Sequence, residues 1–354
     1  MGLKILHSAD WHLDSPFSSF REDRRQALKA AQKKIPGQIR DLCLRENCDL
    51  VLLAGDLFDG LWSMDTLDLV RDALGQCGVP VLISPGNHDF WGQGSPWDQS
   101  WPDNVHIFGP ELSSYVAENG SCRVYGAGFS SMDCRSLLEG FRCSGEETWQ
   151  IGLFHGDPCN SGSPYNPVTS AQIRNSGLHY LALGHIHAAG GLEVGNTVCG
   201  WPGCPMGRGW DETGEKGCLL VELGDRVQVR PVPLDTVRFY DLRAELEGDA
   251  DVLERILPPA DGKNFYRVTL EGYGKVDLQA LSQSHSAVAN LEIRDQSLDP
   301  QTLWCFAGED SLRGAFFGKL RDAAQDADPE LQKKILLAAE LSQKLLEGRE
   351  VVLP

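Results

Sequence analysis

The stretch VPVLISPGNHD, residues 79–89, joins a short apolar run directly to a cluster of polar side chains. The run at 79–83 has the aliphatic and β-branched composition of a buried strand. It stops at Asn87, His88 and Asp89, and a hydrophobic core does not accommodate an amide, an imidazole and a carboxylate without partners. The fold and the function both depend on whether other strands of the chain end in the same way.

Four more apolar runs in the first two-thirds of the chain end at polar residues. They are LKIL (3–6) before HSADWH, DLVLLA (49–54) before GDLFD, WQIGLF (149–154) before HGD, and HYLAL (179–183) before GHIH. Helical periodicity predicts a helix over about 21–47, kinked or split at Pro36, and a second over about 64–76. This alternation predicts an α/β sheet with a site along the carboxyl edge of its strands.

From about residue 195 the pattern changes to short hairpin-like strands, which predicts a second sheet packed on the first. Further along, FYDLRAEL, NFYRVTLEG and ANLEIRD alternate with short helical stretches and predict a β-α-β-α-β unit. Residues 311–349 read as two helices broken around Asp328 and Pro329. We therefore expect three parts: a main domain at 1–234, an α/β capping domain at 235–300 and a helical tail at 301–354.

Composition narrows the classes of function. The net charge of −18, from 32 basic and 50 acidic residues, argues against strong non-specific binding of nucleic acid by the chain alone. No apolar run approaches the roughly 18 residues that span a bilayer, so we expect no membrane association. The start MGLKILHSADWH does not read as a secretory signal. The 11 scattered cysteines, without a Cys-x-x-Cys pair, predict reduced thiols in a cytoplasmic protein.

The polar residues at the strand ends form one candidate set: Asp10, His12, Asp56, Asn87, His88, His155, His185 and His187. A single strand-end Asp or His is usually a cap or a turn residue. Five clusters on five strands are costly to bury without cations, and together they favour a dinuclear metal site. Oxygen ligands mixed with imidazoles suit manganese, iron or zinc, and Asp56 is the natural bridging carboxylate. We expect His88 to face the substrate and Asp89 to orient a loop or His88 itself.

The ordered motifs DWH, GDLFD, GNHD, a lone His and GHIH resemble the calcineurin-like metallophosphoesterase superfamily over about residues 1–225. Within that superfamily, ILHSADWHLDSPF, LVLLAGDLFD, the appendage and the helical tail are similar to SbcD-type DNA repair exonucleases, and HLDSPF to their YhaO-like branch. Many members have Gly where this chain has Asp14. The resemblance implies a two-sheet αββα metallophosphoesterase sandwich with a small α+β capping domain and a C-terminal helical pair.

The resemblance also implies a role for each candidate residue. One metal would be held by Asp10, His12, Asp56 and His187, and the other by Asp56, Asn87, His155 and His185. Two divalent ions, most often manganese with iron or zinc as alternatives, would hold a bridging hydroxide that attacks phosphorus. His88 would act as the general acid or as a donor to the leaving oxygen.

The leading hypothesis is a metal-dependent phosphodiester hydrolase that acts on DNA in repair, as a 3′–5′ exonuclease or also as a single-strand endonuclease. The resemblance implies a protein partner, an SMC-like coiled-coil ATPase (SbcC-type) docked on the tail. A homodimer is a further expectation. The alternative is a phosphodiesterase on a small nucleotide or nucleotide-sugar substrate, which has no obvious use for the last 120 residues. A protein phosphatase is less favoured, because no Arg-Gly follows GDLFD. The complete ligand set argues against an inactive scaffold subunit.

Four weaker signals stay open at the level of the sequence. Arg208, in GWPGCPMGRGW (200–210), is either a substrate-phosphate contact or a surface ion-pair partner. The basic stretch 21–40 either follows a phosphate backbone or is a solvated helix face. Trp91 and Trp97 form a substrate wall or a local core. The apolar stripe of the last helix either folds back on the appendage or docks a partner.

Overall fold

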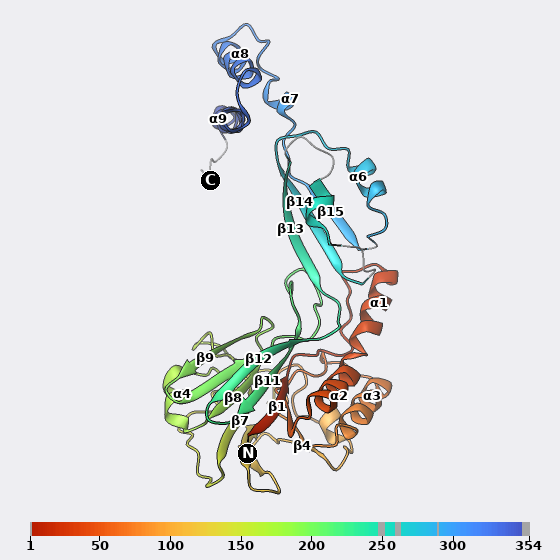
Figure 1. Cartoon of the computed structure of the whole chain (residues 1–354), viewed down its shortest axis with the longest axis vertical. Coiled ribbons are helices and arrows are strands. Elements are labelled where there is room, and N and C mark those ends of the chain that lie inside the picture. Colours follow the sequence, from red (N-terminus) through yellow and green to blue (C-terminus); the bar gives the residue numbers. More distant parts are fainter. Residues whose placement is uncertain (1, 247–251, 259–262, 289, 349–354) are drawn as a thin grey trace. The chain divides into compact units, whose positions relative to one another are not determined.

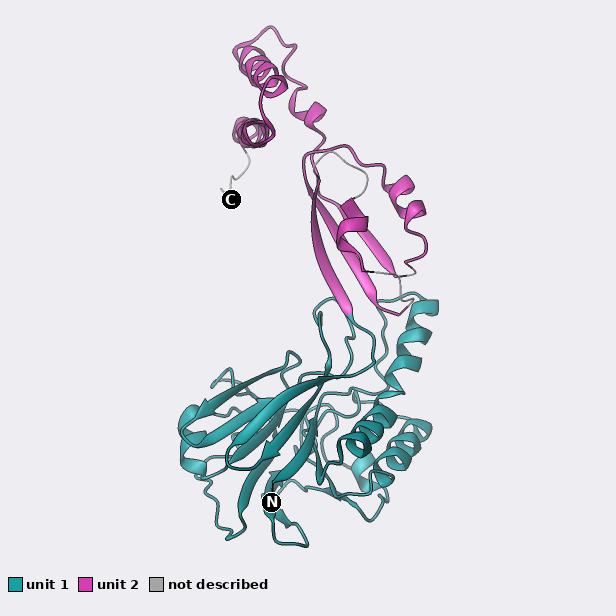
Figure 2. Ribbon diagram, in the orientation of Figure 1, with its two compact units in different colours: residues 1–238 teal, residues 239–354 magenta. Residues whose placement is uncertain are grey.

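The computed structural model describes residues 2–246, 252–258, 263–288 and 290–348. It divides into two compact units, residues 1–238 and 239–354, which Figure 2 shows in different colours. The boundaries expected at 234 and 300 stay predictions.

Unit 1 contains two six-stranded sheets. The first has the order β12-β11-β1-β2-β3-β4, built from β1 (Leu3–Ser8), β2 (Leu50–Leu53), β3 (Val81–Ile83), β4 (Val105–Ile107), β11 (Gly217–Leu223) and β12 (Val227–Pro233). The second has the order β5-β6-β7-β8-β10-β9, built from β5 (Ser113–Val116), β6 (Cys122–Ala127), β7 (Trp149–His155), β8 (Tyr180–Gly184), β9 (Gly190–Val194) and β10 (Thr197–Trp201). Strands β1, β2, β3 and β4 run parallel, as do β6, β7 and β8, so their carboxyl ends share one edge of each sheet.

Helices lie on both outer sides of the paired sheets, as Figure 1 shows. They are α1 (Glu22–Gln32), α2 (Ile35–Glu46), α3 (Met64–Gly75) and α4 (Ser170–Ser176), with the short 3₁₀ helix η1 (Pro96–Asp98) between β3 and β4. The expected helix over 21–47 is split as predicted. Pro36 occupies the first turn of α2, where its missing N–H costs no hydrogen bond.

The core of unit 1 lies between the two sheets. Ile5, Leu52 and Leu82 of the first sheet belong to the same buried cluster as Val124 and Leu153 of the second. A second apolar cluster packs the outer face of the second sheet under α4. These layers confirm the predicted αββα sandwich, but the expected division of the strands at about residue 195 is wrong: β7 and β8 belong to the second sheet, whereas β11 and β12 join the first. The layers bring the carboxyl ends of strands from both sheets to one region.

Unit 2 begins with a three-stranded parallel sheet in the order β13-β14-β15. Its elements are β13 (Phe239–Leu246), α5 (Val252–Ile256), β14 (Phe265–Gly272), α6 (Leu278–Ser284) and β15 (Leu291–Asp295), followed by α7 (Pro300–Leu303), α8 (Leu312–Gln325) and α9 (Pro329–Leu346). The predicted β-α-β-α-β order and the break before Pro329 are confirmed. Helix α7 was not anticipated.

All eleven cysteines carry free thiols, in line with the prediction of reduced cysteines. Among the described residues, none of the helices combines the length and the apolar character needed to cross a bilayer.

Candidate metal centre

Four of the predicted site residues have left-handed backbone conformations, which non-glycine residues rarely adopt. The φ angles are 54° at Asp10, 45° at His12, 52° at Asp56 and 88° at His185. Such residues cost about 1–3 kcal/mol each and persist only where the surroundings fix them. Here the Asp10 amide donates to the Gly55 carbonyl at 3.0 Å and the His12 amide to the Asp56 carbonyl at 2.9 Å. The loops after β1 and β2 therefore hold each other in the strained conformation.

Asp56 lies between two groups of potential metal ligands. Its Oδ2 is 3.7 Å from His12 Nε2 on one side and 3.3 Å from His155 Nε2 on the other. His12 Nε2 in turn faces His187 Nε2 at 3.1 Å. The sequence could supply these residue types, but only the packing of two sheets brings loops 175 residues apart to the same point.

Asn87 and His185 complete the second group. Asn87 Oδ1 lies 2.9 Å from His155 Nε2 and 3.3 Å from His185 Nδ1. The His185 amide donates to Asp10 Oδ1 at 3.0 Å, which links the second group to the first. All seven predicted ligands therefore converge: Asp10, His12, Asp56, Asn87, His155, His185 and His187.

Gly55, directly before Asp56, permits this convergence. It has a φ of +86°, and a Cβ at this position would lie 2.7 Å from His155 Nδ1. That separation is too short for any side chain, so only glycine lets the loop after β2 approach the His155 imidazole. The neighbour that requires glycine at this position is thus an imidazole of the candidate site.

Burial and the attraction between neighbouring charges shift the pKa values of the side chains in the cluster. Burial raises the pKa of the Asp10 carboxyl above its ordinary value. It also lowers the pKa of His185 to about 4, with help from the neighbouring His155 imidazole. Burial opposes the charged form of His155 as well, but the Asp56 carboxylate beside it raises the pKa of His155 to about 9. A buried cluster of this composition needs bound protons or cations to balance its carboxylates.

His88 differs from the other site histidines in its exposure and its partner. Its side chain is 40% exposed, and its Nδ1 lies 3.1 Å from Asp59 Oδ1. Asp59 also lies 3.4 Å from His12 Nδ1 and accepts a hydrogen bond from the Ser15 hydroxyl at 2.8 Å. The hydrogen bond to Asp59 raises the pKa of His88. His88 also has a ring nitrogen within 4.8 Å of ligand atoms of His12 and Asp56.

Sequence reasoning missed Asp59, although it is the last letter of GDLFD. A carboxylate three residues after the bridging candidate was the available signal. Its position beside His88 follows from the loop geometry, because the Asp59 amide donates to the Leu13 carbonyl at 2.9 Å.

Arg208 and Glu212 flank the site on the side of His187. His187 Nδ1 lies 2.8 Å from Glu212 Oε1, and Arg208 Nη2 lies 2.6 Å from the same oxygen. Arg208 Nη1 is 4.0 Å from Asp59 Oδ2, and only 19% of the Arg208 side chain is exposed. Arg208 is therefore a largely buried neighbour of the site rather than a surface ion-pair partner. The sequence carried no signal for Glu212, because nothing local distinguishes it from exposed acids.

Asp89 orients a loop, which was one of the two roles expected for it. Its carboxylate accepts hydrogen bonds from the amides of Leu57, at 2.6 Å, and Gly86, at 2.7 Å. This carboxylate thus ties the loop after β3 to the loop after β2. Burial beside Asp56 raises the pKa of Asp89 to about 7.

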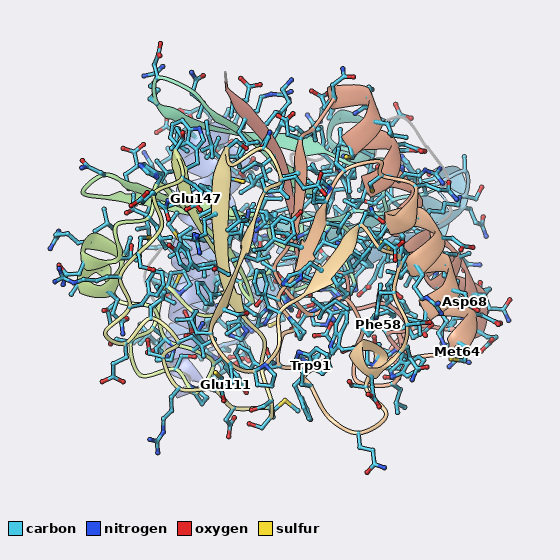
Figure 3. All side chains as sticks on the ribbon, turned by 90° about the horizontal axis from the view of Figure 1, so that it is seen from below. Phe58, Met64, Asp68, Trp91, Glu111 and Glu147 are labelled. Carbon is cyan, nitrogen blue, oxygen red and sulfur yellow. The ribbon has the colours of Figure 1, made fainter. Side chains whose placement is uncertain are left out.

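The tryptophans after GNHD form a local core. Trp97 is buried, donates to the Asp89 carbonyl and packs against Phe58 at a ring separation of 5.8 Å. Trp91 donates to the Phe108 carbonyl at 2.8 Å. Phe58 and Trp91, both labelled in Figure 3, come from the loops after β2 and β3. These rings stiffen the loops that carry Asp56 and Asn87.

Asp14 lies at a position where many metallophosphoesterases similar to this chain have glycine. Its φ of +65° explains the usual glycine. Its carboxylate accepts hydrogen bonds from the Ser63 amide at 2.9 Å and from the Thr66 hydroxyl at 2.9 Å. Asp14 therefore fastens the loop after β1 to the start of α3.

Residues 3–189 match the family model of the calcineurin-like phosphoesterases. Because this match covers more than half of the chain, the protein belongs to the calcineurin-like phosphoesterase family. The family assignment agrees with the two-sheet fold and with a site able to hold divalent metals.

Three curated proteins and one solved structure illustrate the similarity. The chain is 34% identical over 239 residues to the uncharacterized metallophosphoesterase YhaO of Bacillus subtilis, covering 62% of this chain and 57% of that protein. It is 20% identical to a subunit of the nuclease SbcCD of Staphylococcus epidermidis, covering 76% of this chain and 79% of that protein. It is 24% identical to the DNA double-strand break repair protein Mre11 of Aeropyrum pernix, covering 77% of this chain and 68% of that protein. A dimetal phosphatase structure from Danio rerio aligns with 14% identity and a TM-score of 0.46, covering 65% of this chain and 96% of that one.

Proposed function

We propose that this metallophosphoesterase hydrolyses phosphodiester bonds of DNA as a 3′–5′ exonuclease in DNA repair in the cytoplasm. The observation that carries the proposal is the convergence of seven residues with oxygen or nitrogen ligand atoms, Asp56 among them, with the half-exposed His88 beside them. DNA as the substrate is supported by the names of two relatives, a nuclease subunit and a DNA double-strand break repair protein.

The ligand types fit two divalent cations, because mixed oxygens and imidazoles suit manganese, iron or zinc, and we propose manganese. One ion would be held by Asp10, His12, Asp56 and His187, and the other by Asp56, Asn87, His155 and His185. Bound there, the cations would lower the pKa of an attacking water and neutralise charge on the phosphoryl oxygens. Glu212 would orient the His187 ring by accepting a hydrogen bond from its Nδ1–H group. Such a hydrogen bond raises the basicity of the imidazole nitrogen that binds the metal.

His88 is assigned the proton transfer to the leaving oxygen. Asp59 accepts the Nδ1 proton of His88, which leaves Nε2 as the nitrogen that carries the mobile proton. Because an alkoxide leaves poorly at neutral pH, protonation of this oxygen contributes to the rate. Asp59 is the positioning residue for His88.

Arg208 is assigned to a phosphoryl oxygen of the substrate. Its Nη2 forms an ion pair with Glu212, whereas its Nη1 lies 4.0 Å from Asp59 Oδ2, on the side of the site. A guanidinium fixed in this way can stabilise negative charge that increases in the transition state.

A basic helix beside the site supports a polymeric substrate. Gln32, at the end of α1, donates to the His12 carbonyl at 2.6 Å, so α1 is fastened to a loop of the metal centre. Lys29 and Lys33, in and just after α1, are exposed and make no ion pair within the part of the chain that the structure describes. Such side chains in an acidic protein suit a local contact with a phosphate backbone.

The helical pair of unit 2 supports a protein partner. Leu312 is 89% exposed, Leu345 65% and Phe316 44%, and these side chains line a groove of about 650 Å³ between α8 and α9. One part of the apolar stripe, at Leu336, is buried in a cluster with Leu303 and Phe317, whereas the exposed part of the stripe lines this groove. We propose that it docks the coiled coil of an SMC-like ATPase, since an amphipathic helix fits such a groove.

The test of the catalytic proposal compares defined substrates with manganese-loaded protein. We expect stepwise release of nucleotides from DNA ends and slower turnover of small cyclic or sugar-linked phosphodiesters. Efficient hydrolysis of a small nucleotide with no attack on DNA would replace the DNA proposal by the small-substrate alternative.

The test of the partner proposal uses the triple variant Leu312→Ser, Phe316→Ser, Leu345→Ser. We expect loss of co-purification with the coiled-coil ATPase while hydrolysis of bis(p-nitrophenyl) phosphate stays within about twofold of wild type, a change below about 0.5 kcal/mol. Retained co-purification would place the docking surface elsewhere.

A further inference from the structure

Two side chains that no function above uses lie against the second group of ligands. Met132 Sδ is 3.9 Å from the Asn87 amide nitrogen, and the Tyr165 ring packs on the His185 ring with centroids 4.9 Å apart and an interplanar angle of 42°. Met132 is 50% exposed and Tyr165 is partly exposed. An apolar surface is thus available next to the position of the scissile phosphate.

The two segments that carry these side chains are joined to each other. The Cys134 amide donates to the Pro164 carbonyl at 2.8 Å, and the Asn166 amide donates back to the Cys134 carbonyl at 2.7 Å. These bonds make a short parallel bridge between Cys134 and Tyr165. Residues 130–135 and 163–167, which we call the wall, are therefore joined by backbone hydrogen bonds.

Asn166 fastens the wall to the metal centre. Its side-chain nitrogen donates to the His155 carbonyl at 2.8 Å, and its side-chain oxygen accepts from the Leu137 amide at 2.7 Å. Asn166 is fully buried and has a φ of +46°, which the two bonds maintain. The wall is held in fixed relation to a proposed metal ligand, as a preorganised substrate contact requires.

The chemistry of the wall suits an aromatic group better than a second phosphate. Neither the thioether of Met132 nor the ring of Tyr165 carries charge, and both stack favourably on flat rings. The Tyr165 hydroxyl has no hydrogen-bond partner among the described residues, so it remains available to a ligand. Phosphate recognition is already supplied by the ligand cluster, His88 and Arg208.

We propose that Met132 and Tyr165 form a subsite for the base of the nucleotide whose phosphate is hydrolysed. The proposal rests on the phosphodiesterase activity assigned above, but it does not require that the substrate be a DNA polymer. It predicts that the enzyme prefers nucleoside esters over esters of small alcohols because the base stacks on the wall.

The test compares thymidine 5′-(p-nitrophenyl phosphate) with methyl p-nitrophenyl phosphate. Water adds to phosphorus and p-nitrophenolate leaves in both cases, so the two esters differ only in the nucleoside or methyl group that stays on the phosphate. Stacking on one aromatic ring predicts a ratio of kcat/KM, thymidine ester over methyl ester, of about 5 to 150 in the wild type.

Substitutions in the wall test whether it causes the higher kcat/KM for the thymidine ester. We expect Tyr165→Ala and Met132→Ala to bring the ratio towards one, and Tyr165→Phe to keep most of it. Met64→Ala is the matched control, because Met64 is also 50% exposed yet lies on α3, near the margin of the view in Figure 3. Bound metal is measured in every variant, since Tyr165 touches His185.

Two results would overturn the subsite. One is a wild-type ratio near one, and the other is an unchanged ratio in Tyr165→Ala protein that retains its metal. Hydrolysis of neither ester would remove the phosphodiesterase function and the subsite together. A high ratio that depends on Tyr165, in a protein that does not degrade DNA, would support the subsite and contradict only the DNA assignment.

Discussion

The two units of the chain each contain a parallel β-sheet, yet their carboxyl edges differ. In unit 1, strands β1, β2 and β3 are followed by Asp10, Asp56 and Asn87, all of which are buried. In unit 2, β14 ends at Gly272 and β15 at Asp295, whose carboxylate is exposed and accepts a hydrogen bond from the Ser297 amide at 2.9 Å. Within the described part of unit 2, no group of residues suited to a metal was found.

The carboxyl edge of a parallel sheet therefore provides a position for a site, but the side chains at that edge decide whether it can bind a metal. Unit 1 places costly polar groups where they are buried together. Unit 2 instead leaves apolar side chains exposed on its helical pair, which is the usual mark of a binding surface. The proposed catalytic site and the proposed partner-binding surface thus lie in different units of the chain.

The largest effect is expected at Asp56. Asp56→Ala removes the carboxylate shared by both ligand groups. Because the cations then stabilise the transition state less well, by several kcal/mol, we expect kcat/KM to fall by at least about 10⁴-fold. The measurement is hydrolysis of bis(p-nitrophenyl) phosphate together with metal content. The matched control is Asp295→Asn in unit 2, which should behave as wild type. Equal losses in both variants would contradict the comparison between the two edges.

The second effect is expected at His88. His88→Ala removes the proposed proton donor, so turnover falls by about 10²–10⁴-fold while bound metal is retained. His285→Ala, in unit 2, controls for loss of a surface imidazole. Loss of metal in His88→Ala would instead make His88 a ligand.

A smaller effect is expected at Glu212. Glu212→Gln weakens the contact that orients His187, which lowers metal affinity or activity by about 10- to 100-fold. Glu147→Gln is the control, because Glu147 pairs with Arg123 at 2.8 Å and makes no contact with the site. Titration with manganese during steady-state assays separates the two effects. Wild-type metal dependence in Glu212→Gln would count against this role.

The smallest effect is expected at Asp14. Asp14→Ala loses the hydrogen bonds to Ser63 and Thr66 at the start of α3, at a cost of about 1 kcal/mol in the free energy of unfolding. Denaturant unfolding measures this cost. Asp277→Ala, which removes the cap of α6, destabilises unit 2 and leaves hydrolysis unchanged. A loss of activity larger than the loss of stability would give Asp14 a role in the site.

Much of the fold could be predicted because its signals are local. Short apolar runs that stop at polar residues located the strands, and Pro36 located the split between α1 and α2. The grouping of Asp10, Asp56 and Asn87 was also predictable, since neighbouring parallel strands place their carboxyl ends on a common edge. His155, His185 and His187 lie at or just after the ends of strands of the second sheet, so their convergence with these residues depends on the packing of the two sheets. The roles of these ligands stay predictions until metal and substrate are bound.

What could not be predicted depends on contacts between distant segments. Glu212, Tyr165 and Met132 reach the site only through the packing of separate loops, and no periodicity marks them. In α9, hydrophobicity indicated a broad apolar face that includes Leu331, Leu336 and Leu345, whereas of these three packing buries only Leu336. Tertiary packing selects among apolar positions that a single helix presents equally.

The most direct test is the location and number of bound cations in crystals grown with saturating manganese, measured by anomalous diffraction. We predict two manganese ions per chain that share Asp56, one bound by the side chains of the β1 loop and His187, the other by Asn87, His155 and His185. A single ion, or ions bound elsewhere with these seven side chains unliganded, would contradict the account.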